Sequence, residues 1–251
     1  MELDSQFLLF FAIGFGAQLI DGALGMAFGV VASSFLLSLG LPPAVVSLTV
    51  HAAECVTTGS SAISHHAFGN VDGPLFRRLL VPGVLGAIVG AWLLASIPGD
   101  AVRPFIAAYL LIMGAFIIVR AFRELMPRRV TTHLVPLGFF GACIDAVGGG
   151  GWGPFVASNL IARGNDVRNT VGTVNAVEFF VTMAASATFL LTLGLGNWQI
   201  IAGLALGGLL AAPLGAWACR YIPVKPFMIS VGLLVIVLSA RTLYLYIEGD
   251  S

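Results

Sequence analysis

The feature that most constrains this chain is a series of long apolar runs, separated only by short Gly, Pro and charged clusters. Charged residues make up 10% of the 251 positions, whereas a soluble domain carries about 25%. Such a chain cannot cover a water-facing surface, so the sequence predicts an all-α polytopic membrane protein. The runs are continuous rather than alternating, which argues against a membrane β-barrel.

The apolar runs form two sets of five. The first set comprises Phe7–Ile20, Ala23–Leu39, Ala44–Ser64, Pro74–Ser96 and Val102–Phe122. The second set comprises Leu134–Ile144, Trp152–Ala162, Thr170–Leu193, Trp198–Tyr221 and Pro226–Tyr246. The last three of each set have about 20 residues or more, which is enough to cross a bilayer. The first two are shorter, and in the second set they predict a helical hairpin that enters the membrane and turns back, surrounded by protein.

The two halves of the chain resemble each other. GFGAQLIDGALGMAFG at 14–29 aligns with GFFGACIDAVGGGGWG at 138–153, and TVHAAE at 49–54 aligns with TVNAVE at 173–178 at the same offset. Composition alone does not produce a shared order of motifs. We therefore expect one transmembrane domain made of two repeats, residues 1–125 and 126–251. Each repeat would be a short or re-entrant helical hairpin followed by three transmembrane helices.

The distribution of positive charge predicts how the chain is oriented. The central connection, RAFRELMPRRVTTH at 120–133, has four arginines and one glutamate, so we expect this side to face the cytoplasm. Each half then crosses the membrane an odd number of times, and the repeats are inverted. Acidic residues near both ends place both termini outside a multi-pass protein of the cell inner (plasma) membrane. Arg103 fits this orientation less well.

A glycine-rich turn follows the first segment of each half, in DGALGMAFG at 21–29 and DAVGGGGWGP at 145–154. Glycines break a helix and bare its backbone N–H groups. A short helix that begins near Trp152 would point its positive N-terminal end into the membrane, where it suits an anion. Close helix packing is the alternative for any single glycine. The predicted substrate-binding groups here are Gly149, Gly150, Gly151, Trp152 and, in the first half, Gly25.

Acidic and polar side chains recur at equivalent positions of both halves. Asp21 and Asp145 precede the two turns, where each is equally well explained as a helix cap or as a ligand or proton site. In the third segment of each half, a polar residue and a glutamate lie three positions apart and share one helical face. A buried neutral histidine satisfied by a glutamate is the ordinary arrangement in a soluble core, but an ionisable pair within a membrane is a functional hypothesis by default. We expect substrate contact from His51, Asn175, Thr49 and Thr173, and proton coupling or framing of the site by Glu54, Glu178, Asp21 and Asp145.

No other chemistry is indicated by the sequence. It contains no G-x-S-x-G, H-E-x-x-H, P-loop or C-x-x-C motif. We therefore predict no catalytic residue, no resident metal and no cofactor. A net charge of zero gives no reason to expect nucleic acid as a partner.

Taken together, these motifs resemble the sulfite exporter TauE/SafE family of membrane permeases. The resemblance rests on the repeated glycine-rich turn, GNVD at 69–72 with GNWQ at 196–199, and the basic central loop, and it covers almost the whole chain. It implies movement of small anions, typically sulfite or organosulfonates such as sulfoacetate. Met26 stands where the second half has Gly150, so the first turn is expected to engage the substrate less.

The sequence therefore predicts a secondary transporter, an exporter, of a small inorganic or organic sulfur anion. Some carboxylates near an anion must be neutralised, so we expect coupling to protons and alternating access between the repeats. One alternative is a cation or metal transporter that uses the carboxylates and His51 as ligands, against which the positive helix N-termini argue. An integral-membrane enzyme or a scaffold is a further alternative, opposed by the missing nucleophile–base arrangement and the short loops.

Overall fold

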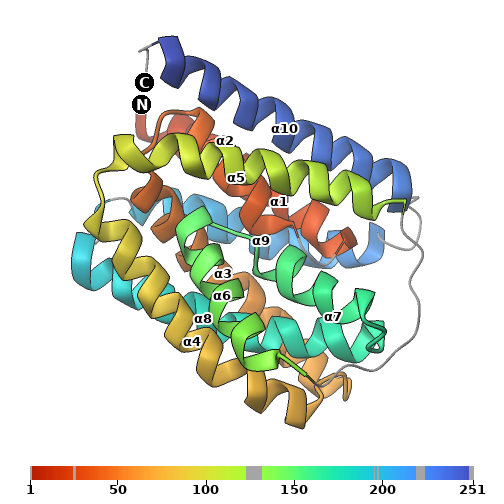
Figure 1. The fold of residues 1–251 in the computed structure, drawn as a ribbon. Coiled ribbons are helices and arrows are strands. Elements are labelled where there is room, and N and C mark those ends of the chain that lie inside the picture. The colour runs from red at the N-terminus through yellow and green to blue at the C-terminus, as the bar shows by residue number, and fades with distance from the viewer. Residues whose placement is uncertain are drawn as a thin grey trace.

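The structure is a computed structural model that describes residues 2–24, 27–122, 132–194, 196, 198–218 and 224–248. All regular elements in these residues are helices, as the sequence predicts. In chain order they are α1 (Glu2–Leu24), α2 (Phe28–Ser38), α3 (Pro43–Ala67), α4 (Gly73–Ser96), α5 (Gly99–Arg120), α6 (Leu134–Gly148), the π-helix η1 (Gly153–Ala157), α7 (Ser158–Ala162), α8 (Val167–Leu193), α9 (Trp198–Ala218) and α10 (Val224–Glu248). Figure 1 shows how they pack.

Within the described residues, four helices are long and apolar enough to cross a membrane: Gly73–Ser96, Gly99–Arg120, Asn169–Leu193 and Met228–Glu248. They match four of the six long segments expected from the sequence. Helix α3 has 25 residues, but His51, Glu54 and several hydroxyl side chains make it less apolar. Helix α9 extends over 21 residues, Trp198–Ala218, of which Trp198–Ala212 form the described apolar part.

The boundary between the first two helices differs from the expected one. Ala23 and Leu24 continue α1, and α2 begins only at Phe28, so the predicted segment start at Ala23 is wrong. The Asp21 carboxylate explains the new boundary, because its Oδ1 accepts hydrogen bonds from the N–H groups of Ala27 at 2.6 Å and Phe28 at 3.2 Å. These bonds fix where the second helix starts.

The second half begins with a broken helix. Helix α6 has 15 residues, a length of about 22 Å at 1.5 Å per residue, which is less than the roughly 30 Å of a bilayer core. It ends at Gly148, and the next three glycines have φ angles of 71°, 149° and 143°. Only glycine adopts such angles readily. The chain then enters η1 and α7, on the other side of the bend (Figure 1).

The helices of the two halves pack in equivalent pairs. Helix α1 lies on α9 and α6 lies on α4, while α3 packs against α8 and α5 against α10. If each helix is replaced by its counterpart in the other half, the α1–α9 pair becomes the α6–α4 pair. The α3–α8 and α5–α10 pairs stay the same. Each half therefore completes its packing with helices from the other half.

Glycines allow several of these pairs to approach backbone to backbone. A Cβ at Gly207 of α9 would overlap the carbonyl of Phe11 in α1, and one at Gly86 of α4 would overlap the carbonyl of Phe139 in α6. In a membrane the lipid is as apolar as the helix side chains, so the hydrophobic effect does not drive helices together. They associate instead by close approach through small residues.

Two arginines hold the C-terminal end of α2. Arg103 of α5 donates from Nη2 to the Gly40 carbonyl at 2.9 Å, and Arg241 of α10 donates to the Ser38 carbonyl. Cations are favourable at this end of a helix, where carbonyls lack intrahelical partners. Arg103 is buried. Its charge therefore serves a structural contact, which explains why it fits the charge-based orientation less well.

The α4–α6 contact gives a direct test of the packing. We expect Gly86→Ala to lower the stability of the folded protein by about 1–3 kcal/mol, because the new methyl group overpacks the interface. The measurement is thermal unfolding in detergent. Gly16→Ala in α1 is the matched control, since a Cβ there meets no atom within 4 Å. Equal unfolding temperatures for the two variants would contradict this packing.

Candidate functional site

An aspartate caps the broken helix in each half. The Asp145 Oδ1 accepts a hydrogen bond from the N–H of Trp152 at 2.8 Å, as Asp21 does from the N–H of Phe28. Phe28 and Trp152 occupy equivalent positions of the repeat. The carboxylates therefore satisfy backbone donors that a helix start leaves free, and both act as caps.

The second aspartate also pairs with a histidine from the other half. His51 is fully buried, and its Nε2 lies 3.1 Å from the Asp145 Oδ2. On the other side of the ring, Nδ1 lies 2.8 Å from the Ser47 carbonyl oxygen. Because both of these partners accept hydrogen bonds, both ring nitrogens are assigned as donors. In this assignment His51 is protonated, so its charge neutralises Asp145, and the pair joins α3 to α6.

The glycine turn after α6 is enclosed by other helices. Tyr109 of α5 donates from its hydroxyl to the Gly150 carbonyl at 3.0 Å, and Ser33 of α2 donates to the Gly149 carbonyl. A Cβ on Gly150 would overlap the backbone of Gly29. The turn is thus held in one conformation by α2 and α5, and sequence reasoning identified neither Tyr109 nor Ser33.

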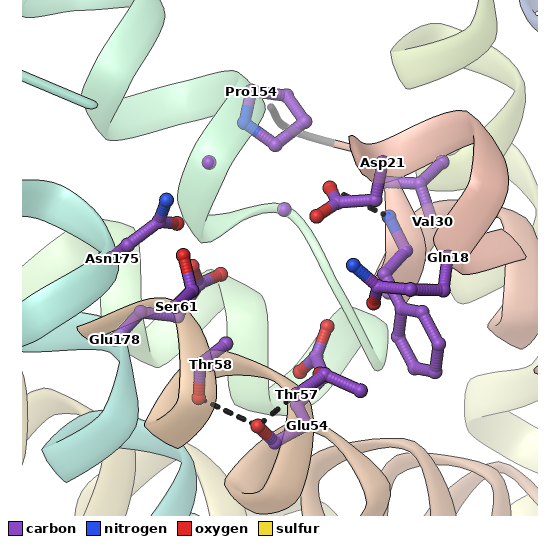
Figure 2. Close-up of a pocket in the computed structure, with 14 residues that line it drawn as sticks. Gln18, Asp21, Val30, Glu54, Thr57, Thr58, Ser61, Pro154, Asn175 and Glu178 are labelled. Atoms are coloured by element: carbon purple, nitrogen blue, oxygen red, sulfur yellow. Dashed lines mark hydrogen bonds between the residues drawn. The ribbon is translucent and has the colours of Figure 1, made fainter. Parts of the chain in front are cut away.

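A small cavity of about 30 Å³ lies beside this turn. Figure 2 shows its wall, which is formed by α1, α2, α3, η1 and α8, and so by both halves of the chain. Five of the predicted site residues line it: Asp21, Glu54, Gly151, Asn175 and Glu178. The structure brings these five together around one space.

The other predicted site residues do not line this cavity. His51 and Trp152 are fully buried, and the Trp152 Nε1 donates to the Val174 carbonyl at 3.1 Å. Thr49 donates to carbonyls of its own helix, and Thr173 donates to the Asn169 carbonyl. Gly149, Gly150 and Asp145 lie behind the wall, in the turn and at its cap, and Gly25 lies outside the described residues.

Sequence reasoning missed several lining residues, and some of them left a signal. Thr57, Thr58 and Ser61 follow Glu54 at three, four and seven positions, which is one helical face. Gly29 and Gly153 line the cavity and are equivalent in the repeat. Gln18 had no such signal, because its counterpart in the second half is an alanine.

The lining is rich in hydrogen-bond acceptors. Asp21, Glu54 and Glu178 contribute three carboxyl groups, and neither lysine nor arginine contributes to the described lining. Glu54 and Gln18 are 4% and 7% exposed, yet among the described residues the Glu54 Oε2 and the Gln18 Oε1 have no hydrogen-bond partner. Buried polar atoms without partners are rare and call for a physical explanation.

Residues at two helix starts line the same cavity. Gly29 and Val30 lie in the first turn of α2, where N–H groups have no intrahelical acceptor, and Gly153 begins η1. These helix starts carry partial positive charge. In the described part of the chain no three His, Cys, Asp or Glu side chains are grouped so that they could hold a metal ion.

Comparisons with known proteins agree on a membrane transporter. The sequence model of the family described as "Sulfite exporter TauE/SafE" matches residues 10–242. "Probable membrane transporter protein YtnM" of Bacillus subtilis (strain 168) is 41% identical over 248 residues, covering 95% of this chain and 83% of that protein. "Probable membrane transporter protein ORF9" of Sinorhizobium sp is 29% identical over 236 residues, covering 90% and 87%. No solved structure matches the chain.

The histidine–aspartate pair makes a prediction that uses the repeat as its own control. We expect His51→Ala to lower the stability by about 3–5 kcal/mol, because it leaves the Asp145 carboxylate buried without a cation. Asn175→Ala, at the equivalent position beside the cavity, should cost roughly 1 kcal/mol or less. Chemical or thermal unfolding of the two variants in detergent measures the difference. Similar losses for both would contradict the assigned ion pair.

Proposed function

Since this chain belongs to the sulfite exporter TauE/SafE family, we propose that it exports a small sulfur-containing anion, such as sulfite or a sulfoacetate-like organosulfonate. The family consists of membrane transporters, and the four long apolar helices agree with a multi-pass membrane protein. The transport would be secondary, driven by the gradient of the anion itself and coupled to protons, with no catalytic step and no cofactor.

The observation that carries this proposal is the meeting of two helix starts at one cavity. The first-turn N–H groups of α2 and the glycine turn before η1 offer backbone donors to an oxyanion. Asn175 adds a side-chain amide from α8. We propose that Gly151 and Asn175 contact the anion directly.

His51 has a different proposed role, because its ring nitrogens are engaged by Asp145 and Ser47. It would keep the Asp145 carboxylate in place, and that carboxylate fixes the start of the helix at Trp152. Gly149, Gly150 and Trp152 would act in the same way, by shaping the turn. Thr49 and Thr173 would support the two helices that carry the site.

Proton coupling follows from the charge of the lining. Three ionised carboxylates beside an anion would repel it, since the interaction of like charges is strong where water is scarce. We propose that Glu54 and Glu178 take up protons when the anion binds and release them on the other side. Asp21 remains a cap, because its Oδ1 is held by two backbone N–H groups.

Alternating access would come from movement of one half against the other. The exchange of packing partners between residues 1–125 and 126–251 supports two repeats, and the charge distribution supports their inversion. We place the protein in the cell inner (plasma) membrane with both termini outside. The start of α1 and the end of α10 lie at the same end of the molecule (Figure 1), which agrees with termini on one side.

A cation transporter is the second candidate, and the acceptor-rich lining is the observation that favours it. Such a site would use the same carboxylates. It would not use His51 as a ligand, however, because the ring nitrogens already have partners, and the positive helix starts oppose a cation.

Flux through proteoliposomes tests the proposal. We expect the purified protein to transport sulfite or sulfoacetate. Transport should be faster when a pH gradient drives protons in the same direction as the anion. Glu54→Gln keeps the shape of the side chain but cannot exchange a proton, so it should abolish the response to the pH gradient. Asp100→Asn, an exposed position in the first turn of α5, is the control and should transport normally.

Two results would contradict this proposal. Uptake of divalent cations without any anion flux would favour the cation transporter. Sulfite and sulfoacetate flux that responds to pH equally in the wild type and in Glu54→Gln would remove Glu54 from the coupling mechanism.

A further inference from the structure

The cavity is lined by two chemically different kinds of group, which we call its first and second walls. The first wall comprises the backbone N–H donors of Gly29, Val30 and Gly153, at the starts of α2 and η1. The second wall comprises carboxyl and amide side chains, with Asp21 and Gln18 from α1, Glu54 from α3 and Glu178 from α8 (Figure 2). An anion alone would be complementary only to the first wall.

Two buried atoms of the second wall have no partner. The Glu54 Oε2 and the Gln18 Oε1 lack hydrogen bonds among the described residues, although Glu54 and Gln18 are only 4% and 7% exposed. An acceptor that is removed from water without a donor destabilises the folded protein. A ligand that brings donors to both atoms would remove that cost, and an oxyanion brings none.

The repeat offers a comparison for the missing group. His51 and Asp145 in one half-site are equivalent to Asn175 and Asp21 in the other. In the first half-site the imidazole supplies a cation to its aspartate at 3.1 Å. In the second, the shorter Asn175 side chain leaves space unfilled, and this space is the cavity. Neither lysine nor arginine contributes to its described lining. The empty half-site thus lacks the positive group that the filled one contains.

We propose that the transported molecule is a zwitterion, an organic sulfur anion with an ammonium group a few bonds away. The anionic end would accept hydrogen bonds from the helix starts at Gly29 and Gly153. The ammonium group would donate to the Glu54 and Gln18 oxygens and be balanced by the neighbouring carboxylates. This inference rests on the proposed transport function and adds the substrate class.

The ammonium group changes what the proton is needed for. A plain anion needs protonated carboxyl groups beside it, whereas a zwitterion brings its own positive charge to them. An amino-bearing substrate should therefore move with little response to a pH gradient. A plain anion of the same size should need that gradient.

Matched sulfonates test this in proteoliposomes. The probes are 2-aminoethanesulfonate, its hydroxyl analogue 2-hydroxyethanesulfonate, and the N,N,N-trimethyl derivative of the amine, which keeps the charge but has no N–H donor. We expect the apparent affinity for uptake of the amine to be at least about tenfold higher than that for the trimethyl compound. This is the usual effect of one charge-assisted hydrogen bond. The hydroxyl compound should be taken up poorly unless a pH gradient supplies protons.

Variants show whether the second wall causes this preference. Glu54→Gln should remove most of the preference for the amine over the hydroxyl compound, while Asp100→Asn should leave it unchanged. Asn175→His should place a ring beside Asp21, fill the half-site and block uptake of the amine. Size-exclusion profiles and unfolding temperatures check that each variant is folded.

The outcomes separate this inference from the transport proposal. Equal uptake of the amine and hydroxyl compounds, with the same dependence on pH, would overturn the zwitterion and leave anion transport standing. Uptake of none of these compounds, nor of sulfite, would overturn the transport of sulfur anions itself. Preference for the amine that survives in Glu54→Gln would also overturn the assignment of its binding wall.

Discussion

The bond between an aspartate carboxylate and the first N–H groups of a broken helix is the interaction on which the centre of this protein depends. A helix that starts inside a membrane exposes donors that lipid cannot satisfy. Asp21 and Asp145 satisfy them in the two halves, at Phe28 and Trp152. The cavity exists because these two starts are fixed next to each other, with α3 and α8 across from them.

The two halves have the same plan but different chemistry. In one half-site the Asp145 carboxylate is neutralised by His51, and the space is filled by side chains. In the other, Asn175 is too short to fill the same role, and an open, acceptor-lined space remains. The half-site with histidine is thus filled by side chains, whereas the half-site with asparagine opens onto the cavity. The duplication alone therefore did not indicate which of the two half-sites opens onto the cavity.

Much of the architecture follows from patterns in the sequence, and the exceptions have physical causes. Apolar runs predicted the helices, since lipid permits few other structures, and the aligned motifs brought Glu54 and Glu178 to one place. The start of α2 was misplaced by five residues, from Ala23 to Phe28, because apolarity does not record a cap. His51 was expected in the cavity, but the pairing of its Nε2 with Asp145 depends on a contact between residues 94 positions apart. Gln18 has no polar counterpart in the repeat, so only the fold could reveal it.

The enclosed glycine turn limits how the protein can change over generations. A side chain at Gly150 would collide with the backbone of Gly29, and one at Gly151 would collide with the hydroxyl of Tyr109. A single substitution in the turn is therefore strained unless the α2 backbone or the Tyr109 side chain has already moved. New specificities would have to arise in the side chains of α1, α3 and α8, which can be replaced one at a time around an unchanged turn.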